Sequence, residues 1–163
     1  MPNTHNTTYI NILIDTLKKK ESVLRDLTAA TDAQAALLEA DELDLDAFNA
    51  QVDEKDTLLA RLADLDEGFM ELYEKVRMEL IDHTSLYAKQ VKEVQQLVRT
   101  QTELSTALQA AEERNRTKLS IHLSRSHQKT RDYKVSSQTA AAYYRNMSGK
   151  HQDGESYFFN RKK

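Results

Sequence analysis

The stretch that decides the fold runs from Asp41 to Leu65 and reads DELDLDAFNAQVDEKDTLLARLADL. It contains a turn followed by the start of the strongest apolar stripe in the chain. Asp44 is predicted to cap the following helix, because its carboxylate can accept hydrogen bonds from the free amides of the first turn. Leu43 can pack on Phe48 as a hydrophobic staple across this cap. From Phe48 to Leu80, the positions of a stripe recur every three or four residues and are apolar except for Lys55, which predicts one face of a long helix.

Two further amphipathic patterns flank this helix. The first runs from Ile10 to Leu38, and the second from Val91 to Leu119. Lys20 occupies an apolar position of the first pattern, where we expect its stem to lie along the surface and its head to reach water. The capping residues at 82–85 predict a turn between the second and third helices. The expected helices therefore cover about residues 8–40, 44–82 and 85–128.

The composition favours an all-α fold. The 163 residues include three glycines and one proline, too few for the many tight turns of a sheet protein. Short links between long helices make sequential helices antiparallel neighbours. We expect a long antiparallel helical hairpin, extended to a three-helix bundle or coiled coil within a single domain over 1–128.

Charge divides the chain into an acidic body and a basic end. Residues 1–113 carry 11 Lys/Arg and 23 Asp/Glu, a net charge of −12, whereas residues 114–163 carry 12 and 3, a net charge of +9. Over 129–163 the periodicity stops and the sequence becomes polar and basic, with clustered aromatic residues. We expect this tail to be disordered when unbound.

No pattern in the sequence predicts an enzyme, a metal site or a cofactor. The acidic stretch lacks the glycine of a calcium loop, and the five histidines have no zinc-ligand spacing. The basic end matches no nucleic-acid motif, so we expect no nucleic-acid partner. The first twenty residues lack the apolar run of a signal peptide, and no segment is apolar enough to cross a membrane, so we expect a cytoplasmic location without membrane insertion.

The order of these parts resembles the FlgN-type flagellar export chaperones. The likeness lies in EADELDLDAFNAQVDEKDTLLARLADL, Glu39–Leu65, with its Glu54-Lys55-x-x-Leu58-Leu59 segment, and in the terminal SYFFNRKK at 156–163. Leu43 stands where many members have a glycine. The resemblance implies a chaperone that binds hook-filament junction proteins, prevents their premature polymerisation and delivers them to the type III export apparatus.

The resemblance also implies that the client binds towards the C-terminal end of the chain. A client could dock an amphipathic helix with anchors at helical spacing on the weaker half of the third helix, with tail aromatics folding over it. The alternative functions are a structural coiled-coil homodimer and an adaptor that uses the basic end, and we expect a monomer or weak dimer. The client-binding residues predicted here are Leu104, Leu108, Ala111, Leu119, Leu123, Tyr143, Tyr144, Tyr157, Phe158 and Phe159.

Overall fold

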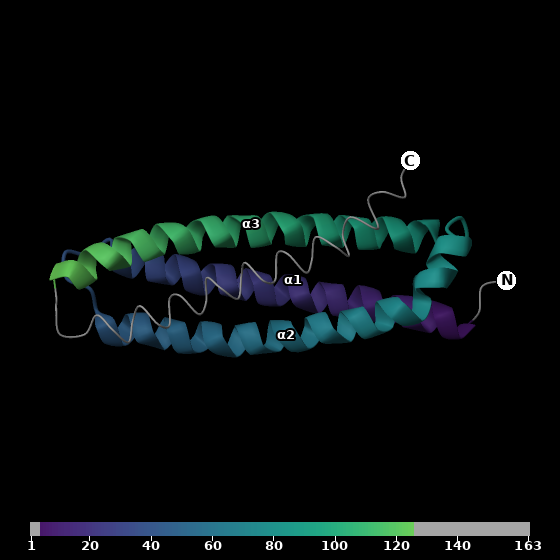
Figure 1. Cartoon of the computed structure of the whole chain (residues 1–163), viewed down its shortest axis with the longest axis horizontal. Helices are drawn as coiled ribbons and strands as arrows, with labels where there is room; N and C mark the ends of the chain where they lie inside the picture. Colours follow the sequence, from purple (N-terminus) through teal and green to yellow (C-terminus); the bar gives the residue numbers. More distant parts are fainter. Residues whose placement is uncertain (1–3, 126–163) are drawn as a thin grey trace.

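Three long helices make up the part of the chain that the structure, a computed structural model, describes, which is residues 4–125. Helix α1 spans Thr4–Leu38, α2 spans Leu45–Asp82 and α3 spans Ala88–Arg125. The chain runs along the bundle, returns and runs along it again, so that α1 and α3 point the same way and α2 points the opposite way (Figure 1). The expected all-α three-helix fold is confirmed.

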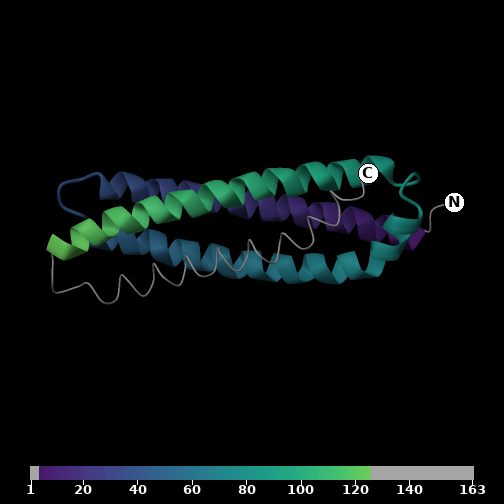
Figure 2. The same cartoon turned by 45° about the horizontal axis from the view of Figure 1, so that its top comes forward.

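Helix α1 is the central element, because it packs closely along both α2 and α3, whereas these two approach each other much less (Figures 1 and 2). Its buried face is correspondingly wide and includes neighbouring pairs such as Leu13 with Ile14 and Val23 with Leu24. A helix that contacts one neighbour buries a narrower stripe. The tail expected over 129–163 lies outside the described residues.

The turn between α1 and α2 is organised by Asp44. Its carboxylate accepts a hydrogen bond from the Ala47 amide at 3.0 Å, which satisfies one of the free donors at the start of α2. Leu43 and Phe48 both belong to the apolar cluster under this turn. The geometry is that of an N-cap with a hydrophobic staple.

The turn between α2 and α3 occupies residues 83–87 and needs no glycine. The Leu86 amide donates to the His83 carbonyl at 3.0 Å, and the Thr84 hydroxyl donates to the Leu80 carbonyl at 2.8 Å. No residue of the described chain has a positive φ. Helix α3 begins three residues later than expected, because residues 85–87 complete this turn.

Buried Tyr87 anchors the turn to the bundle. Its hydroxyl donates to the Glu79 carboxylate at 3.1 Å. Burial, followed by this hydrogen bond and the charge of Glu79, raises the pKa of the Tyr87 phenol above its ordinary value. The phenol therefore stays neutral at the pH of the cell and acts as a packing group.

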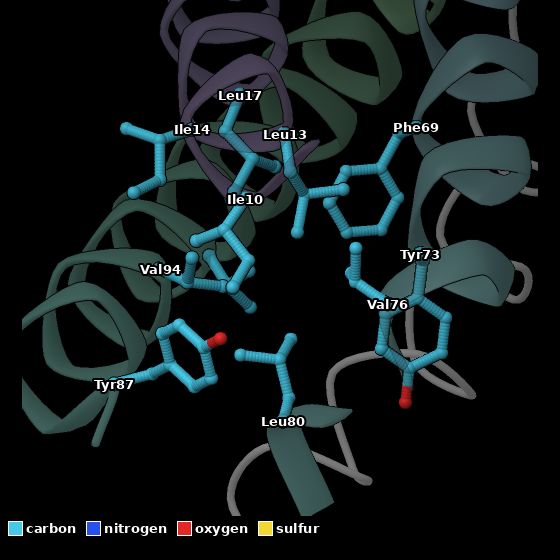
Figure 3. Packing of buried hydrophobic residues seen from close by; sticks show 11 residues of the cluster. Ile10, Leu13, Ile14, Leu17, Phe69, Tyr73, Val76, Leu80, Tyr87 and Val94 are labelled. Carbon is cyan, nitrogen blue, oxygen red and sulfur yellow. The ribbon is translucent and has the colours of Figure 1, made fainter. Parts of the chain in front are cut away.

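The apolar core is divided into three clusters along the bundle axis. The first lies at the end that holds the α2–α3 turn and joins residues such as Leu13, Val76 and Val94 from the three helices (Figure 3). The middle cluster includes Leu27, Leu62 and Leu108. The third, which we call the end cluster, lies by the α1–α2 turn and contains four buried residues: Leu38, Phe48, Leu119 and Leu123.

A buried ion pair lies at the boundary between the first and middle clusters. The Lys20 ammonium is 2.6 Å from an Asp66 carboxylate oxygen and 5.2 Å from the centre of the Phe69 ring. The Lys20 side chain is only 1% exposed. The expectation that its head reaches water was wrong, because α2 supplies both a carboxylate and an aromatic face to an ammonium that points into the bundle.

Candidate client-binding region

A network of buried polar side chains separates the middle cluster from the end cluster. We call it the polar layer. The Lys55 ammonium forms an ion pair with Glu112 and donates to the Gln34 side-chain oxygen at 2.8 Å. The Thr31 hydroxyl lies 3.3 Å from the same Glu112 oxygen. The polar layer consists of Thr31, Gln34, Lys55, Glu112 and Asn115.

Three side chains of α3 reach backbone carbonyls of α1. The Gln101 amide donates to the Leu17 carbonyl at 2.6 Å, and the Asn115 amide donates to the Thr31 carbonyl at 3.0 Å. The His122 Nε2 lies 2.8 Å from the Leu38 carbonyl, which can only accept, so this nitrogen carries the hydrogen. Each pair is 84 residues apart, a multiple of seven, so α1 and α3 run parallel with their heptads in register.

The buried face of α3 is half polar. Its buried residues include Val94, Val98, Leu108, Leu119 and Leu123, together with an equal number of polar ones. The polar set is Gln95, Gln101, Ser105, Glu112 and Asn115. Sequence reasoning described the second half of this helix only as its weaker half and did not identify the buried role of Glu112. Gln101 and Asn115 each lie a whole number of heptads after the residue of α1 that they contact. This spacing was the signal that could have identified the contacts.

The structure places five of the predicted client-binding residues, two of them partly exposed and three buried. Leu104 and Ala111 are partly exposed on α3. Leu108 lies in the middle cluster, while Leu119 and Leu123 lie in the end cluster; all three are at most 3% exposed. The five tail aromatics, Tyr143, Tyr144, Tyr157, Phe158 and Phe159, lie outside the described residues.

A pocket of about 480 Å³ opens beside the end cluster. The α1–α2 turn contributes Asp41, Glu42 and Leu43 to its lining. The last turns of α3 close the other side, and the described chain ends at the pocket, since Arg125 is among its lining residues. The remaining lining residues are Leu45, His122 and Leu123.

Within residues 4–125 the structure contains no cluster of three or more acidic or histidine side chains that could hold a metal ion. None of the three helices is long and apolar enough to cross a membrane. The bundle combines three features. The buried face of α3 is half polar, the end cluster lies at the end of this helix, and a pocket adjoins that cluster. The class of protein that the described residues define is an all-α bundle of three long helices.

The chain belongs to the FlgN protein family, which it matches over residues 1–146. No match was found among curated proteins, and none among solved structures. FlgN proteins are cytoplasmic, non-enzymatic chaperones that bind flagellar hook-associated proteins and the export apparatus. The predicted function is confirmed: the chain is a flagellar export chaperone for hook-associated proteins.

Proposed function

We propose that the chaperone holds an amphipathic terminal helix of its client against the second half of α3, and that the end of α3 parts from the bundle when the client binds. The observation that carries this proposal is the half-polar buried face of α3. When such a helix separates from its neighbour, water takes over each amide-to-carbonyl hydrogen bond. The separation therefore costs only about 1 kcal/mol of net free energy for each bond.

The partly exposed residues of α3 offer the first contact. Leu104 packs at the edge of the middle cluster and Ala111 lies two turns further along the helix. A client helix with apolar side chains at matching spacing could dock here without any change in the bundle.

The polar layer limits how far the bundle opens. The end cluster contains four buried apolar residues, and the Lys55–Glu112 pair separates it from the middle cluster. Local opening free energies are lowest where few apolar contacts hold a segment. Residues beyond Asn115 can therefore separate while the rest of α3 stays seated, and Leu119 and Leu123 then become available to the client.

A reversible cross-link tests the opening step. The chain contains no cysteine, so a pair introduced at Glu39 and Lys118, which form an exposed ion pair, is the only site for a cleavable bismaleimide. We expect the cross-link to weaken binding of a purified hook-filament junction protein by at least about tenfold in calorimetry, and cleavage to restore it.

The matched control uses the other end of the same helix interface. Lys18 and Glu93 also form an exposed ion pair, at 3.3 Å, and a cross-link there leaves the end cluster free to open. We expect client binding to stay within about twofold of the uncross-linked chain. If the two cross-links have equal effects on binding, the opening of the α3 end is refuted.

Leu104→Glu tests the docking surface itself. A charge at this partly exposed site is expected to weaken client binding by about tenfold or more, because it must be desolvated under the client helix. Ile12→Glu is the control, since Ile12 is 42% exposed on α1, away from the proposed site. Full affinity of a folded Leu104→Glu variant would contradict the proposed surface.

A further inference from the structure

We propose that the pocket at the end of the bundle binds the chain's own terminal segment SYFFNRKK, residues 156–163, when no client is present. Two properties of the pocket point to this occupant. Its lining includes three leucines, Leu43, Leu45 and Leu123, which we call the apolar floor, and two acidic residues, Asp41 and Glu42, which we call the rim. An occupant must therefore combine large apolar side chains with positive charge.

The rim carboxylates are available to a ligand. Asp41 and Glu42 are exposed and form no ion pair with any residue of the described chain. The neighbouring acids are engaged, since Glu39 pairs with Lys118 and Asp44 caps α2. Two free carboxylates beside an apolar floor favour a segment in which aromatic and basic residues are adjacent.

The terminal segment has this composition. It contains three aromatic residues followed by three basic ones and has no acidic residue. The rings of Tyr157, Phe158 and Phe159 could cover the apolar floor, and Arg161 and the two terminal lysines could pair with the rim. Arg125 lines the pocket and could stack on an aromatic ring.

Chain length permits the contact. The described chain ends at Arg125, which lines the pocket, and thirty residues separate it from Ser156. Thirty residues span up to roughly 100 Å when extended, far more than the return requires. A tethered segment also has an effective concentration on the order of millimolar, so even a weak contact is well occupied.

Occupation of the pocket would compete with client binding. Leu123 belongs both to the pocket floor and to the proposed client-binding surface, so the terminal segment and the client compete for it. This competition rests on the proposed function. Binding of the terminal segment to the pocket does not, and it can be tested without any client.

The test adds a fluorescently labelled SYFFNRKK peptide to the full-length chain and follows its anisotropy. In the Phe158→Ser/Phe159→Ser variant, whose own segment cannot fill the pocket, we expect saturable binding that weakens as salt is raised. In the unmodified chain the tethered segment competes, so the peptide is expected to bind about tenfold more weakly or worse.

Charge reversal at the rim locates the site. Asp41→Lys/Glu42→Lys, added to the Phe158→Ser/Phe159→Ser chain, is expected to weaken peptide binding by about tenfold or more. The control is Asp53→Lys/Glu54→Lys, two exposed acids of α2 outside the pocket, which should leave peptide affinity unchanged.

Three results would overturn the assignment. The first is absence of peptide binding to the Phe158→Ser/Phe159→Ser chain, and the second is equal loss of affinity in both charge reversals. The third is dimerisation in sedimentation that requires intact Phe158 and Phe159, which would place the segment on another copy. None of these three measurements involves a client. They therefore test the pocket independently of the proposed client-binding surface.

Discussion

Helices α2 and α3 are equally long, at 38 residues each, and both pack along α1, but they are held there by different forces. Lys55 is the single non-hydrophobic member of the buried set of α2, whereas half of the buried residues of α3 are polar. Burial of a leucine contributes about 1.5–3 kcal/mol, and a hydrogen bond contributes about 1 kcal/mol net. We therefore expect the α1–α2 hairpin to be the more stable pair of helices and α3 to be the helix that opens first.

The polar layer also gives α3 a defined position. Hydrophobic contacts along a heptad stripe tolerate a slide of seven residues, because the same residue types meet again. The contact of Glu112 with Thr31 of α1 and its ion pair with Lys55 of α2 join particular side chains, so they are satisfied only in one register. If the end of α3 opens as proposed, these contacts would return it to the same register.

Among the substitutions that test this difference between α2 and α3, removal of Glu112 should have the largest effect on the free energy of unfolding. Both side chains of the Lys55–Glu112 pair are at least nine-tenths buried, so Glu112→Ala leaves a buried ammonium without its counter-charge. We expect a loss of about 3–5 kcal/mol in the free energy of unfolding by urea. Lys55→Leu/Glu112→Leu should recover part of it, because no buried charge remains.

The neighbouring Glu113 provides the control for this prediction. Its pair with Arg116 is exposed, so Glu113→Ala should change stability by no more than about 0.5 kcal/mol. Comparable losses in Glu112→Ala and Glu113→Ala would show that the polar layer is not a structural determinant.

Truncation of one leucine in each part of the core should have the next largest effect. Leu62 is fully buried on α2 in the middle cluster, so Leu62→Ala is expected to cost about 2–5 kcal/mol and to speed amide exchange throughout the bundle. Leu119→Ala should speed exchange mainly beyond Asn115, because the end cluster opens locally. Hydrogen exchange read by mass spectrometry separates the two patterns, and a uniform effect of Leu119→Ala would remove the distinction.

The smallest expected effect concerns the start of α2. Asp44→Ala removes the cap on the Ala47 amide and should cost about 1 kcal/mol in the free energy of unfolding. Asp46, in the first turn of α2, favours the helix through its charge alone, so Asp46→Ala should cost only a few tenths of a kcal/mol. A loss in Asp46→Ala as large as that in Asp44→Ala would show that charge, not capping, fixes this turn.

Much of the fold could be predicted from the sequence because the relevant signals are local. The apolar stripe from Phe48 to Leu80 predicted α2, and the capping chemistry at Asp44 matches the observed start of that helix. The turn near Asp82 coincides with the observed break at 83–87. Helix α1 begins at Thr4, earlier than the expected Thr8, because its first turn is polar and carries no periodic signal.

The candidate site was less predictable, because its properties depend on partners that are distant in sequence. The apolar stripe of α3 predicts that Leu108 and Leu119 are buried. It does not show whether they are buried in the core of the same chain or against a client. The local sequence does not distinguish Glu112 from a surface acid. Its role depends on Lys55 of α2, with which it forms a buried ion pair.

The sequence by itself determined three helices, their apolar faces and the acidic turn between the first two, because periodicity and capping act within a few residues. Tertiary structure alone decided which helix lies at the centre and how α3 is seated on α1. Lys20 meets Asp66, and Asn115 meets the Thr31 carbonyl, only after the helices have packed. Those contacts join residues 46 and 84 positions apart, a separation over which local patterns carry no information.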